Sequence, residues 1–475
     1  MMQLRPYQQL AKDLLREKFV QLIRKVILVI GCGGGKTNIA ADIIRDAAKR
    51  GKRVIFLAHR RELIYQARDR LKQFGIDASL ILGGHQKDYS NIVQVASIQS
   101  LLRQDLPKAD IVFVDECHTS TSEGYKAVIE RYYNQGAFII GLTATPFRTD
   151  KKGLGEIYQD FVQPIQNSEL IEQGAVLPTK VYGSGKISSK SFRKKMGEFD
   201  SADVMKAFDT NNVYINLILN YQKYADGLQT IVFCQNVEHS IKTRDCFREN
   251  GYIAEHIDSD MSDAERNDII DRYRKGLVQV LCNYGILAEG FDVPATMCVI
   301  MNCATTSLIK WIQACGRCQR WVLNKTHGIV IDMADNWKRF GSPEKNIVVE
   351  LNPDPKKKKE DGIAPISLCG NCYFVMSAKA LSCPECGWIK PIKTAPQIKE
   401  EIFIELTKKE QEEIKRKDKD IIDQANIELN KGAWISFTKN DWNRVPSELL
   451  RAFAKFKGYN NGWVWNEKQK RGVKY

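Results

Sequence analysis

The sequence lacks any apolar run long enough to cross a membrane. Its apolar stretches, such as Val26 to Ile30, are far shorter than the roughly 20 residues that span a bilayer. It also lacks an N-terminal apolar segment with a small-residue cleavage site, so we expect the chain to stay in the cytoplasm, where it is made. A secreted disulfide framework is excluded as well, because the 13 cysteines are odd in number and scattered along the chain.

The composition is typical of a soluble globular protein with a basic balance. The chain has 475 residues, of which 43% are hydrophobic and 27% are charged. This length predicts about three domains at roughly 150 residues each. Lysine and arginine number 71 against 57 acidic residues, giving a formal net charge of +14. Such an excess favours a polyanionic partner, and nucleic acid is the leading class.

Apolar β-rich runs alternate with helical patterns in two stretches, residues 25–145 and 229–334. This alternation predicts an α/β chain with two parallel sheets, each covered by helices. The lysine-rich residues that follow have no apolar periodicity and are interpreted as a linker. The expected units are a first lobe (1–160), a second lobe (161–345), a linker (346–365), a zinc ribbon (366–390) and a basic C-terminal module (391–475).

The loop Ile30–Thr37 follows an apolar strand and opens a helical pattern. In this context backbone N–H groups and a helix N-terminus bind a phosphate chain, which indicates an ATP site. Ile30 stands where the strict GxxxxGK[ST] pattern has glycine, so a tight glycine turn without a phosphate is the alternative. We assign Lys36 to the β- and γ-phosphates and Thr37 to Mg²⁺, with the loop backbone supplied by Gly33, Gly34 and Gly35.

The segment Ile111–His118 ends an apolar strand with two adjacent carboxylates. Hydrolysis of ATP needs one carboxylate to hold Mg²⁺ and another to orient and deprotonate water. We assign Asp115 to the metal and Glu116 to the water. Given the glycine loop upstream, the alternative of a merely polar strand end is disfavoured.

The DECH tetrapeptide, with further motifs in the same order, resembles the superfamily-two helicases of the DEAD/DEAH-related type. The resemblance covers residues 1–340 and implies two RecA-like lobes with ATP and Mg²⁺ between them. Leu4–Gln8 resembles the adenine-reading element, which implies that Gln8 pairs with the base. Leu57–Leu63 and Val95–Leu101 resemble motifs that track a DNA strand, which implies contacts from His59, Arg60, Ser97 and Gln99.

The resemblance continues through the second lobe. Asn283–Pro294 resembles the motif whose Gly290 and Asp292 face the nucleotide, and it implies a DNA contact at Asn283. Gln313–Arg320 has the QxxGRxxR form, and its implied catalytic residues are Gln313, Arg317 and Arg320. Two guanidiniums brought from the opposite lobe stabilise a transferring phosphate only when the cleft closes. In the first lobe, Thr143–Arg148 resembles the motif that couples ATP state to lobe movement.

Two CxxC pairs ten residues apart lie after the linker. Four thiolates on two tight turns form the tetrahedral set that closes a structural Zn²⁺ site, although disulfides or a redox pair are the alternatives. The expected ligands are Cys369, Cys372, Cys383 and Cys386. Another CxxC, formed by Cys315 and Cys318, has no partner pair nearby, so we interpret these cysteines as core residues.

Two basic segments each leave two interpretations open. The stretch Lys186–Lys195 is either a solvated loop or a contact for phosphates. The last 25 residues contain seven lysines and arginines and one acidic residue, interleaved with aromatic residues. Their aromatic side chains either form a small core or stack on DNA bases through Trp463 and Trp465.

The motifs together predict an ATP-dependent DNA helicase or translocase that works as a monomer on branched or forked DNA. DNA is preferred because local strings such as GLGEIY and AEGFDVP resemble the branch-migration and fork-remodelling helicases of phage and bacteria, which implies a role in replication, recombination or repair within a host cytoplasm. An RNA helicase and the motor subunit of a restriction system are the alternatives. A non-catalytic nucleic-acid clamp is disfavoured because the residues for hydrolysis are present.

Overall fold

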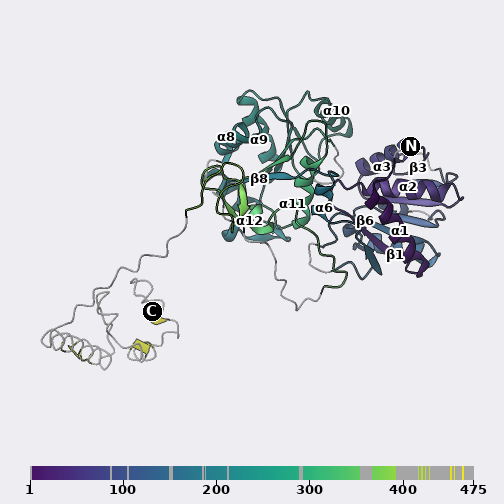
Figure 1. The fold of residues 1–475 in the computed structure, drawn as a ribbon, viewed down its shortest axis with the longest axis horizontal. Coiled ribbons are helices and arrows are strands. Elements are labelled where there is room, and N and C mark those ends of the chain that lie inside the picture. Colours follow the sequence, from purple (N-terminus) through teal and green to yellow (C-terminus); the bar gives the residue numbers. More distant parts are fainter. Residues whose placement is uncertain are drawn as a thin grey trace. The chain divides into compact units, whose positions relative to one another are not determined.

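The computed structural model contains two compact units, Met1–Lys390 and Pro391–Tyr475. The first unit holds two α/β lobes and a small ribbon (Figure 1). The residues that the structure describes are 3–85, 88–103, 106–148, 153–184, 187, 189–210, 213–287, 293–353, 366–391 and ten single residues between 416 and 464.

The first lobe is built on a parallel seven-stranded sheet in the order β3-β4-β2-β5-β6-β1-β7. Its strands are β1 (Lys25–Val29), β2 (Val54–Ala58), β3 (Ser79–Ile81), β4 (Val93–Ser97), β5 (Ile111–Val114), β6 (Phe138–Thr143) and β7 (Asp160–Val162). Its helices are α1 (Pro6–Val20), α2 (Lys36–Ala48), α3 (Arg61–Gln73), α4 (Ile98–Leu102), the short turn η1 (Cys117–Thr119), α5 (Glu123–Asn134) and α6 (Asn167–Glu172).

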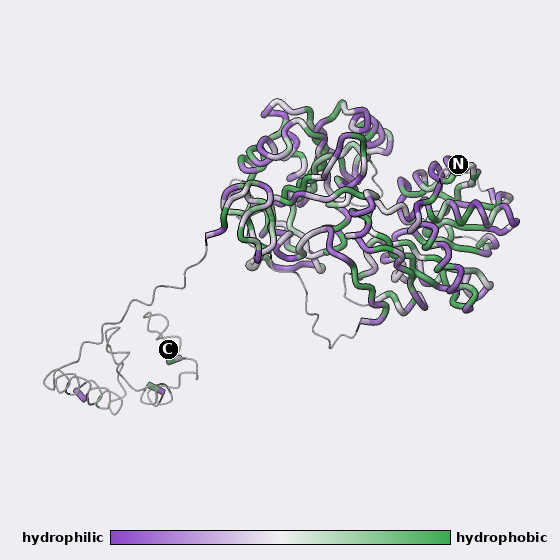
Figure 2. Tube along the Cα trace, in the orientation of Figure 1, coloured by the Kyte–Doolittle hydropathy of each residue, from purple (hydrophilic) through white to green (hydrophobic). Residues whose placement is uncertain are grey.

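The second lobe has a parallel six-stranded sheet in the order β12-β13-β11-β14-β15-β8. Its strands are β8 (Thr179–Gly183), β11 (Thr230–Cys234), β12 (Ala254–Ile257), β13 (Val280–Asn283), β14 (Cys298–Asn302) and β15 (Gly328–Asp332), and a separate hairpin pairs β9 (Lys194–Lys195) with β10 (Glu198–Phe199). Its helices are η2 (Ser189–Ser191), α7 (Ser201–Thr210), α8 (Val213–Ala225), α9 (Val237–Glu249), α10 (Asp263–Arg274), α11 (Leu308–Cys315), η3 (Gly316–Gln319) and α12 (Asn336–Phe340). The predicted α/β class with two tandem lobes is confirmed, and hydrophobic stretches run through the interior of both lobes (Figure 2).

The chain passes between the lobes more than once. β7 joins the first sheet across the expected boundary at residue 160, and Leu170 and Val176 still pack in the first-lobe core. After the second sheet, residues 344–353 return to the first lobe. There Val349 and Leu351 pack against its core, and Gly155 donates its N–H to the carbonyl oxygen of Leu351 at 2.9 Å. The first part of the expected linker is therefore a docked strap, whereas residues 354–365 lie outside the described part of the chain.

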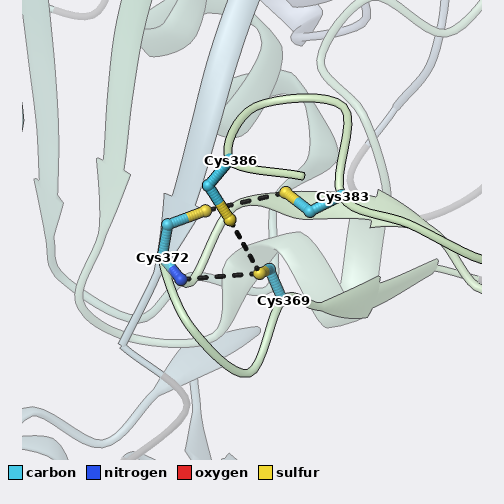
Figure 3. A group of neighbouring side chains, drawn as sticks. All are labelled: Cys369, Cys372, Cys383 and Cys386. Carbon is cyan, nitrogen blue, oxygen red and sulfur yellow. Dashed lines mark hydrogen bonds between the residues drawn. The ribbon is translucent and has the colours of Figure 1, made fainter. Parts of the chain in front are cut away.

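The cysteine-rich ribbon then packs on the edge strand β8 of the second lobe. Its strands β16 (Ile366–Leu368) and β17 (Val375–Ser377) are antiparallel, and the cysteine side chains face one another beside them (Figure 3). Glu385 bonds to Lys180 at 2.8 Å and to the hydroxyl of Tyr182 at 3.2 Å. The hydroxyl of Tyr224 donates to the carbonyl oxygen of Cys372 at 2.8 Å. The ribbon is thus joined to the lobe by side-chain contacts on several sides.

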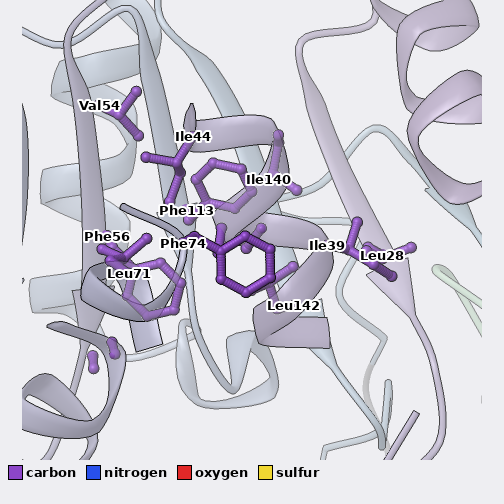
Figure 4. Close-up of a cluster of buried hydrophobic side chains, with 14 of the residues drawn as sticks. Leu28, Ile39, Ile44, Val54, Phe56, Leu71, Phe74, Phe113, Ile140 and Leu142 are labelled. Atoms are coloured by element: carbon purple, nitrogen blue, oxygen red, sulfur yellow. The ribbon is translucent and has the colours of Figure 1, made fainter. Parts of the chain in front are cut away.

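Each parallel sheet is buried on both faces, which explains why its strands are almost continuously apolar. Figure 4 shows one face of the first sheet, where Ile39 and Ile44 of α2 and Leu71 of α3 meet Phe56 and Phe113 of the strands. The opposite face packs against α4 and α5. Because the strands are held on both sides, residues just beyond their carboxyl ends have fixed positions.

No described helix is long and apolar enough to cross a membrane. Most of the unit Pro391–Tyr475, including Trp465, lies outside the described residues. Of the residues described there, Leu450, Ala454 and Val464 are buried. Trp463 is half-buried in a helical segment.

A buried ion pair between α1 and α2 generates a stability prediction. Lys12 contacts Asp42 and lies 2.9 Å from Asp46, and the side chains of Lys12 and Asp42 are 7% and 5% exposed. We expect Asp42→Ala to lower the free energy of unfolding by about 3 kcal/mol, because it leaves a buried ammonium with one partly exposed partner. Chemical denaturation followed by circular dichroism measures this change.

The matched control for that variant is Asp13→Ala on α1, the helix that carries Lys12. Asp13 pairs with Arg16 in an exposed contact, so its loss should lower the free energy of unfolding by less than about 1 kcal/mol. Equal destabilisation by the two variants would contradict the importance assigned to the buried pair.

Candidate active site

The phosphate loop connects β1 to α2. Gly33 and Gly35 have φ angles of 85° and 82°, a conformation that glycine adopts without steric penalty. A β-carbon at Gly34 would collide with the side chain of Ile30, which is buried in the core in place of the glycine of the strict pattern. Lys36 begins α2, and its Nζ donates to the carbonyl oxygen of Ile30 at 3.2 Å. The loop therefore presents backbone at the start of a helix, a geometry that binds anions.

Helix α1 holds this loop in place. The hydroxyl of Tyr7 donates to the carbonyl oxygen of Gly34 at 2.9 Å, and Nε2 of Gln8 donates to the same oxygen at 3.3 Å. The Oε1 atom of Gln8 accepts from the backbone N–H of Arg5 at 3.0 Å. Gln8 thus lies against the phosphate loop, and its pairing with adenine stays a prediction.

The DECH carboxylates follow β5, at the same edge of the sheet as the loop. Glu116 has a φ angle of 45°, and its N–H donates to Oδ1 of Asp115 at 3.1 Å. Nδ1 of His118 lies 3.3 Å from Oε2 of Glu116 and 3.2 Å from the hydroxyl oxygen of Thr143. His118 therefore joins the carboxylate pair to the Thr143–Arg148 segment.

The two carboxylates differ in their affinity for a proton. Burial, together with the charge of Glu116, raises the pKa of Asp115 to about 7. Burial also disfavours the charged form of Glu116, but the hydrogen bond and charge of His118, with Lys36 and Arg317, hold the pKa of Glu116 below its ordinary value. Glu116 therefore ionises readily, whereas Asp115 ionises less readily. A divalent cation would stabilise the charged form of both carboxylates.

The segment formed by α11 and η3 brings the second lobe directly onto the phosphate loop. A β-carbon at Gly316 would lie 2.7 Å from Cβ of Cys32, and a β-carbon at Gly33 would collide with the guanidinium of Arg320. This approach is close because both glycines lack side chains. The structure therefore places Arg320 at the loop.

Two further residues of the same segment meet Glu116. Nε2 of Gln313 donates to Oε2 of Glu116 at 3.4 Å. The guanidinium of Arg317 is near enough for its charge to lower the pKa of Glu116. The residues named from the QxxGRxxR resemblance are thus gathered at the candidate hydrolytic site, although they come from the other lobe.

A cavity of about 580 Å³ lies next to this site, between the lobes. Arg60 also bridges the lobes, since its Nη1 donates to the carbonyl oxygens of Gly285 and Ile286 at 3.3 Å each. No carboxylate occurs among the lining residues that the structure describes. The cavity lining includes basic or amide side chains from Arg60, His118, Arg148, Asn283, Lys310 and Gln313.

The residues expected to contact a DNA strand lie in different settings. Gln99 is exposed, and His59 is half-buried beside Arg60. The hydroxyl of Ser97 is instead the N-cap of α4 and accepts from the N–H of Ser100 at 3.1 Å. Asn283 is completely buried and donates to the carbonyl oxygen of Val232 at 2.9 Å. The side chain of Ser97 is thus occupied by nearby backbone, whereas Asn283 borders the cavity while its amide group bonds to backbone. Gly290 and Asp292 lie outside the described residues.

The four cysteines of the ribbon gather their sulfurs in one place (Figure 3). All four Sγ atoms lie within 4.8 Å of one another. The Cys369–Cys386 and Cys372–Cys383 sulfur pairs are 3.6 Å apart, too far for a disulfide bond of about 2.05 Å. Sulfurs bound at about 2.3 Å to one tetrahedral Zn²⁺ lie about 3.8 Å apart, so the spacing fits that ion.

Cys315 and Cys318 are in a different environment. Both are completely buried in the second-lobe core, and the thiol of Cys318 donates to the carbonyl oxygen of Cys315 at 3.2 Å. Burial raises the pKa of both thiols. Such protonated thiols behave as small apolar residues.

Two protein families match the lobes. Residues 1–148 match the family described as "Type III restriction enzyme, res subunit", and residues 209–322 match the "Helicase conserved C-terminal domain". The first range contains the phosphate loop and the carboxylate pair, and the second contains the arginine motif. The chain belongs to the superfamily-two helicases of the DEAD/DEAH-related type.

Curated relatives match this chain over much of its length. The helicase is 26% identical over 456 residues to a "51.5 kDa protein" of Lactococcus phage (isolate 7-9), covering 92% of this chain and 97% of the phage protein. It is 28% identical to IRC3 of Saccharomyces cerevisiae, named an ATP-dependent helicase, and the match covers 69% of this chain and 51% of IRC3. The chain is therefore an enzyme that couples ATP hydrolysis to nucleic-acid unwinding.

Two solved structures share the fold of the helicase. One is a fragment of an HsdR subunit of a type I restriction enzyme from Vibrio vulnificus, with a TM-score of 0.58 and 22% identity over 73% of this chain and 68% of that one. The other is the Type ISP restriction-modification enzyme LlaBIII, with a TM-score of 0.52 and 18% identity over 70% of this chain and 28% of that one. Both confirm the arrangement of two RecA-like lobes.

Sequence reasoning did not assign roles to three residues that the structure places at the site. His118 and Arg148 lie within the DECH and TATPFR motifs, so the sequence already indicated that they are near the site, although no role was assigned to them. Lys310 lies in LIKWIQAC, which is the pattern of an apolar core helix, and only the packing of α11 against the cavity reveals its position.

Proposed function

We propose that this helicase is an ATP-dependent DNA translocase that remodels branched DNA by branch migration, fork reversal or duplex unwinding, in replication, recombination or repair. The observation that carries the proposal is the interlobe cavity, whose described lining includes Arg60, Lys310 and Arg148, the last paired with Glu156, and no carboxylate. A surface of this charge suits a phosphate backbone. Kinship of the first lobe to a restriction-enzyme family supports DNA over RNA.

ATP and Mg²⁺ fit the site next to this cavity. The phosphate chain is assigned to the loop backbone of Gly33–Gly35 and to Lys36, and the metal to Thr37 and Asp115. When bound, Mg²⁺ neutralises charge on the phosphates. Glu116 orients and deprotonates the attacking water while Gln313 holds its carboxylate. The arginines Arg317 and Arg320 stabilise the charge of the transferring phosphate only when the lobes meet. Gly290 and Asp292 complete the predicted set.

The cysteine set of the ribbon fits a structural Zn²⁺ ion. Its four sulfurs have tetrahedral spacing, and they leave no position open for catalysis. When bound, Zn²⁺ stabilises a two-stranded ribbon that is too small to fold alone. The ion would thereby hold Glu385 and Cys372 in their contacts with the second lobe.

A second candidate function is the motor of a restriction system. The match of residues 1–148 to the res-subunit family favours it. The sequence offers no evident nuclease cluster of acidic residues with lysine in its tail, so cleavage would need another chain. Incubation with plasmid DNA, ATP and Mg²⁺ tests whether the protein cuts DNA by itself.

The choice of nucleic acid is tested by ATPase stimulation. We expect single-stranded and forked DNA to raise the ATPase rate well above that with RNA of equal length, and the effect to fall as salt rises because phosphate contacts release counterions. Steady-state assays on single-stranded, duplex and forked DNA and on RNA measure it. Stimulation by RNA without stimulation by DNA would establish the RNA-helicase alternative.

Substitutions test the assigned ATPase roles. We expect Lys36→Ala, Glu116→Gln and Arg320→Ala to lower kcat by about 1,000-fold or more, because each removes a group that acts on the transferring phosphate or the water. Glu116→Gln should still bind nucleotide, since the phosphate contacts remain. The matched control Glu123→Gln changes an exposed carboxylate and should keep normal turnover. Near-normal turnover of Glu116→Gln would remove this residue as the base.

Elemental analysis tests the metal site. We expect one Zn²⁺ per chain in protein purified without chelator, lost in Cys383→Ser with Cys386→Ser because two of the four thiolates are removed. Cys246→Ser is the matched control, since Cys246 is a partly exposed free thiol away from the ribbon. Protein without zinc, or unchanged zinc in the double variant, would contradict the assignment. Cys315 and Cys318 should contribute no ligand.

A further inference from the structure

A basic β-hairpin in the second lobe has no part in the proposed ATPase site. β9 and β10 pair Lys195 with Glu198 and Lys194 with Phe199. The two-residue turn between them is Met196-Gly197. This hairpin ends the basic stretch whose role the sequence left open, of which Lys186 and Ser188 lie outside the described residues.

The turn exposes methionine in an unfavourable backbone conformation. Met196 and Gly197 have φ angles of 50° and 86°, the type I′ geometry that favours Asn-Gly. Met196 is 99% exposed, more than any other large apolar side chain that the structure describes. Since the side chain buries nothing here and glycine would suit the backbone better, Met196 contributes nothing to the stability of the isolated protein.

The base of the hairpin is fixed to the second lobe. The carboxylate of Glu198 accepts from the hydroxyl of Thr305 at 2.7 Å and from the N–H of Thr306 at 2.8 Å. Phe199 is buried in the second-lobe core, and its ring packs edge-on against Phe192 with centroids 5.6 Å apart. The base of the hairpin is therefore held by the second lobe, while its tip is exposed to solvent.

The charge around the tip is positive. Lys194 and Lys195 are exposed and make no salt bridge to a described residue. Arg193 is held by Asp203 through two bonds of 2.8 and 2.9 Å, which orients the incoming chain. The one acidic residue of the hairpin, Glu198, faces inward to the threonines. Two exposed lysines on β9 thus lead directly into an apolar tip.

The anchor of the hairpin adjoins the interlobe cavity. Thr306 directly precedes Ser307, the N-cap of α11, and Ser307 and Lys310 line the cavity. The same helix continues into η3 and Arg320 at the phosphate loop. A movement of the second lobe relative to that loop therefore carries the hairpin with it.

We propose that the hairpin Arg193–Phe199 separates the strands at a junction of single- and double-stranded DNA. Met196 packs against the terminal base pair, as apolar side chains do when they unstack base steps, and Lys194 and Lys195 contact the phosphates beside it. This inference rests on the proposed action on DNA. It assigns opening of the junction to the second lobe and not to the aromatic C-terminal tail.

A binding assay without ATP tests the proposal directly. The probe is a DNA fork with 2-aminopurine in the base pair at the junction, whose fluorescence rises when that base unstacks. We expect full-length protein at saturation to raise the signal, and Met196→Gly to reduce the rise by at least about fivefold at similar affinity, because it removes the wedge and keeps the phosphate contacts. Glycine fits the positive φ angle, so the variant retains the hairpin.

Two further variants distinguish the role of the apolar tip from the role of the lysines and from a general effect of substituting an exposed residue. Leu22→Gly is the matched control, since Leu22 is also an exposed apolar residue with a positive φ angle of 61°, but lies in the first lobe; it should behave as wild type. Lys194→Gln with Lys195→Gln should weaken binding and lower the salt slope by about 2, while the signal at saturation stays.

The outcomes distinguish this proposal from the proposed function. A normal fluorescence rise in Met196→Gly, or no rise in the wild type, overturns the strand-separating role. If the wild type opens the junction but DNA does not stimulate its ATPase, the translocase function fails and the hairpin role stands. In an active enzyme, single-stranded DNA should still stimulate the ATPase of Met196→Gly. The variant should unwind forks at least about tenfold more slowly, which corresponds to an increase of about 1.4 kcal/mol in the activation free energy of unwinding.

Discussion

The close contact between η3 and the phosphate loop is the constraint on which the arrangement of this protein depends. Gly316 meets Cys32, and Arg320 occupies the space that a side chain at Gly33 would need. Through the same contact Gln313 reaches the carboxylate of Glu116. Neither lobe contains the whole set of polar groups, so chemistry at the loop is tied to the relative position of the lobes.

The chain itself limits how the lobes move. Residues 344–353 leave the second lobe and dock on the first, where the main chain of Leu351 bonds to Gly155. The ribbon then returns to the edge strand β8 through Glu385 and Cys372. The chain after the second sheet therefore contacts both lobes in turn, and a bound metal in the ribbon would stiffen one of these contacts.

Basic side chains and carboxylates lie in neighbouring but distinct places at the lobe interface. Arg60, Arg148 and Lys310 line the cavity, whereas Asp115 and Glu116 follow β5, and Glu116 contacts His118. The lysines of the β9–β10 hairpin are also exposed.

The sequence by itself determined the α/β class, the order of the elements, the phosphate loop, the carboxylate pair and the cysteine set, because these follow from local periodicity and fixed short spacings. Only the tertiary structure decided that Lys310 faces a cavity, that the hydroxyl of Ser97 caps a helix, and that part of an apparent linker is a docked strap. The reason is physical. Contacts between residues far apart in the chain depend on which faces pack together, and a short string such as LIKWIQAC or KKM does not encode its partner.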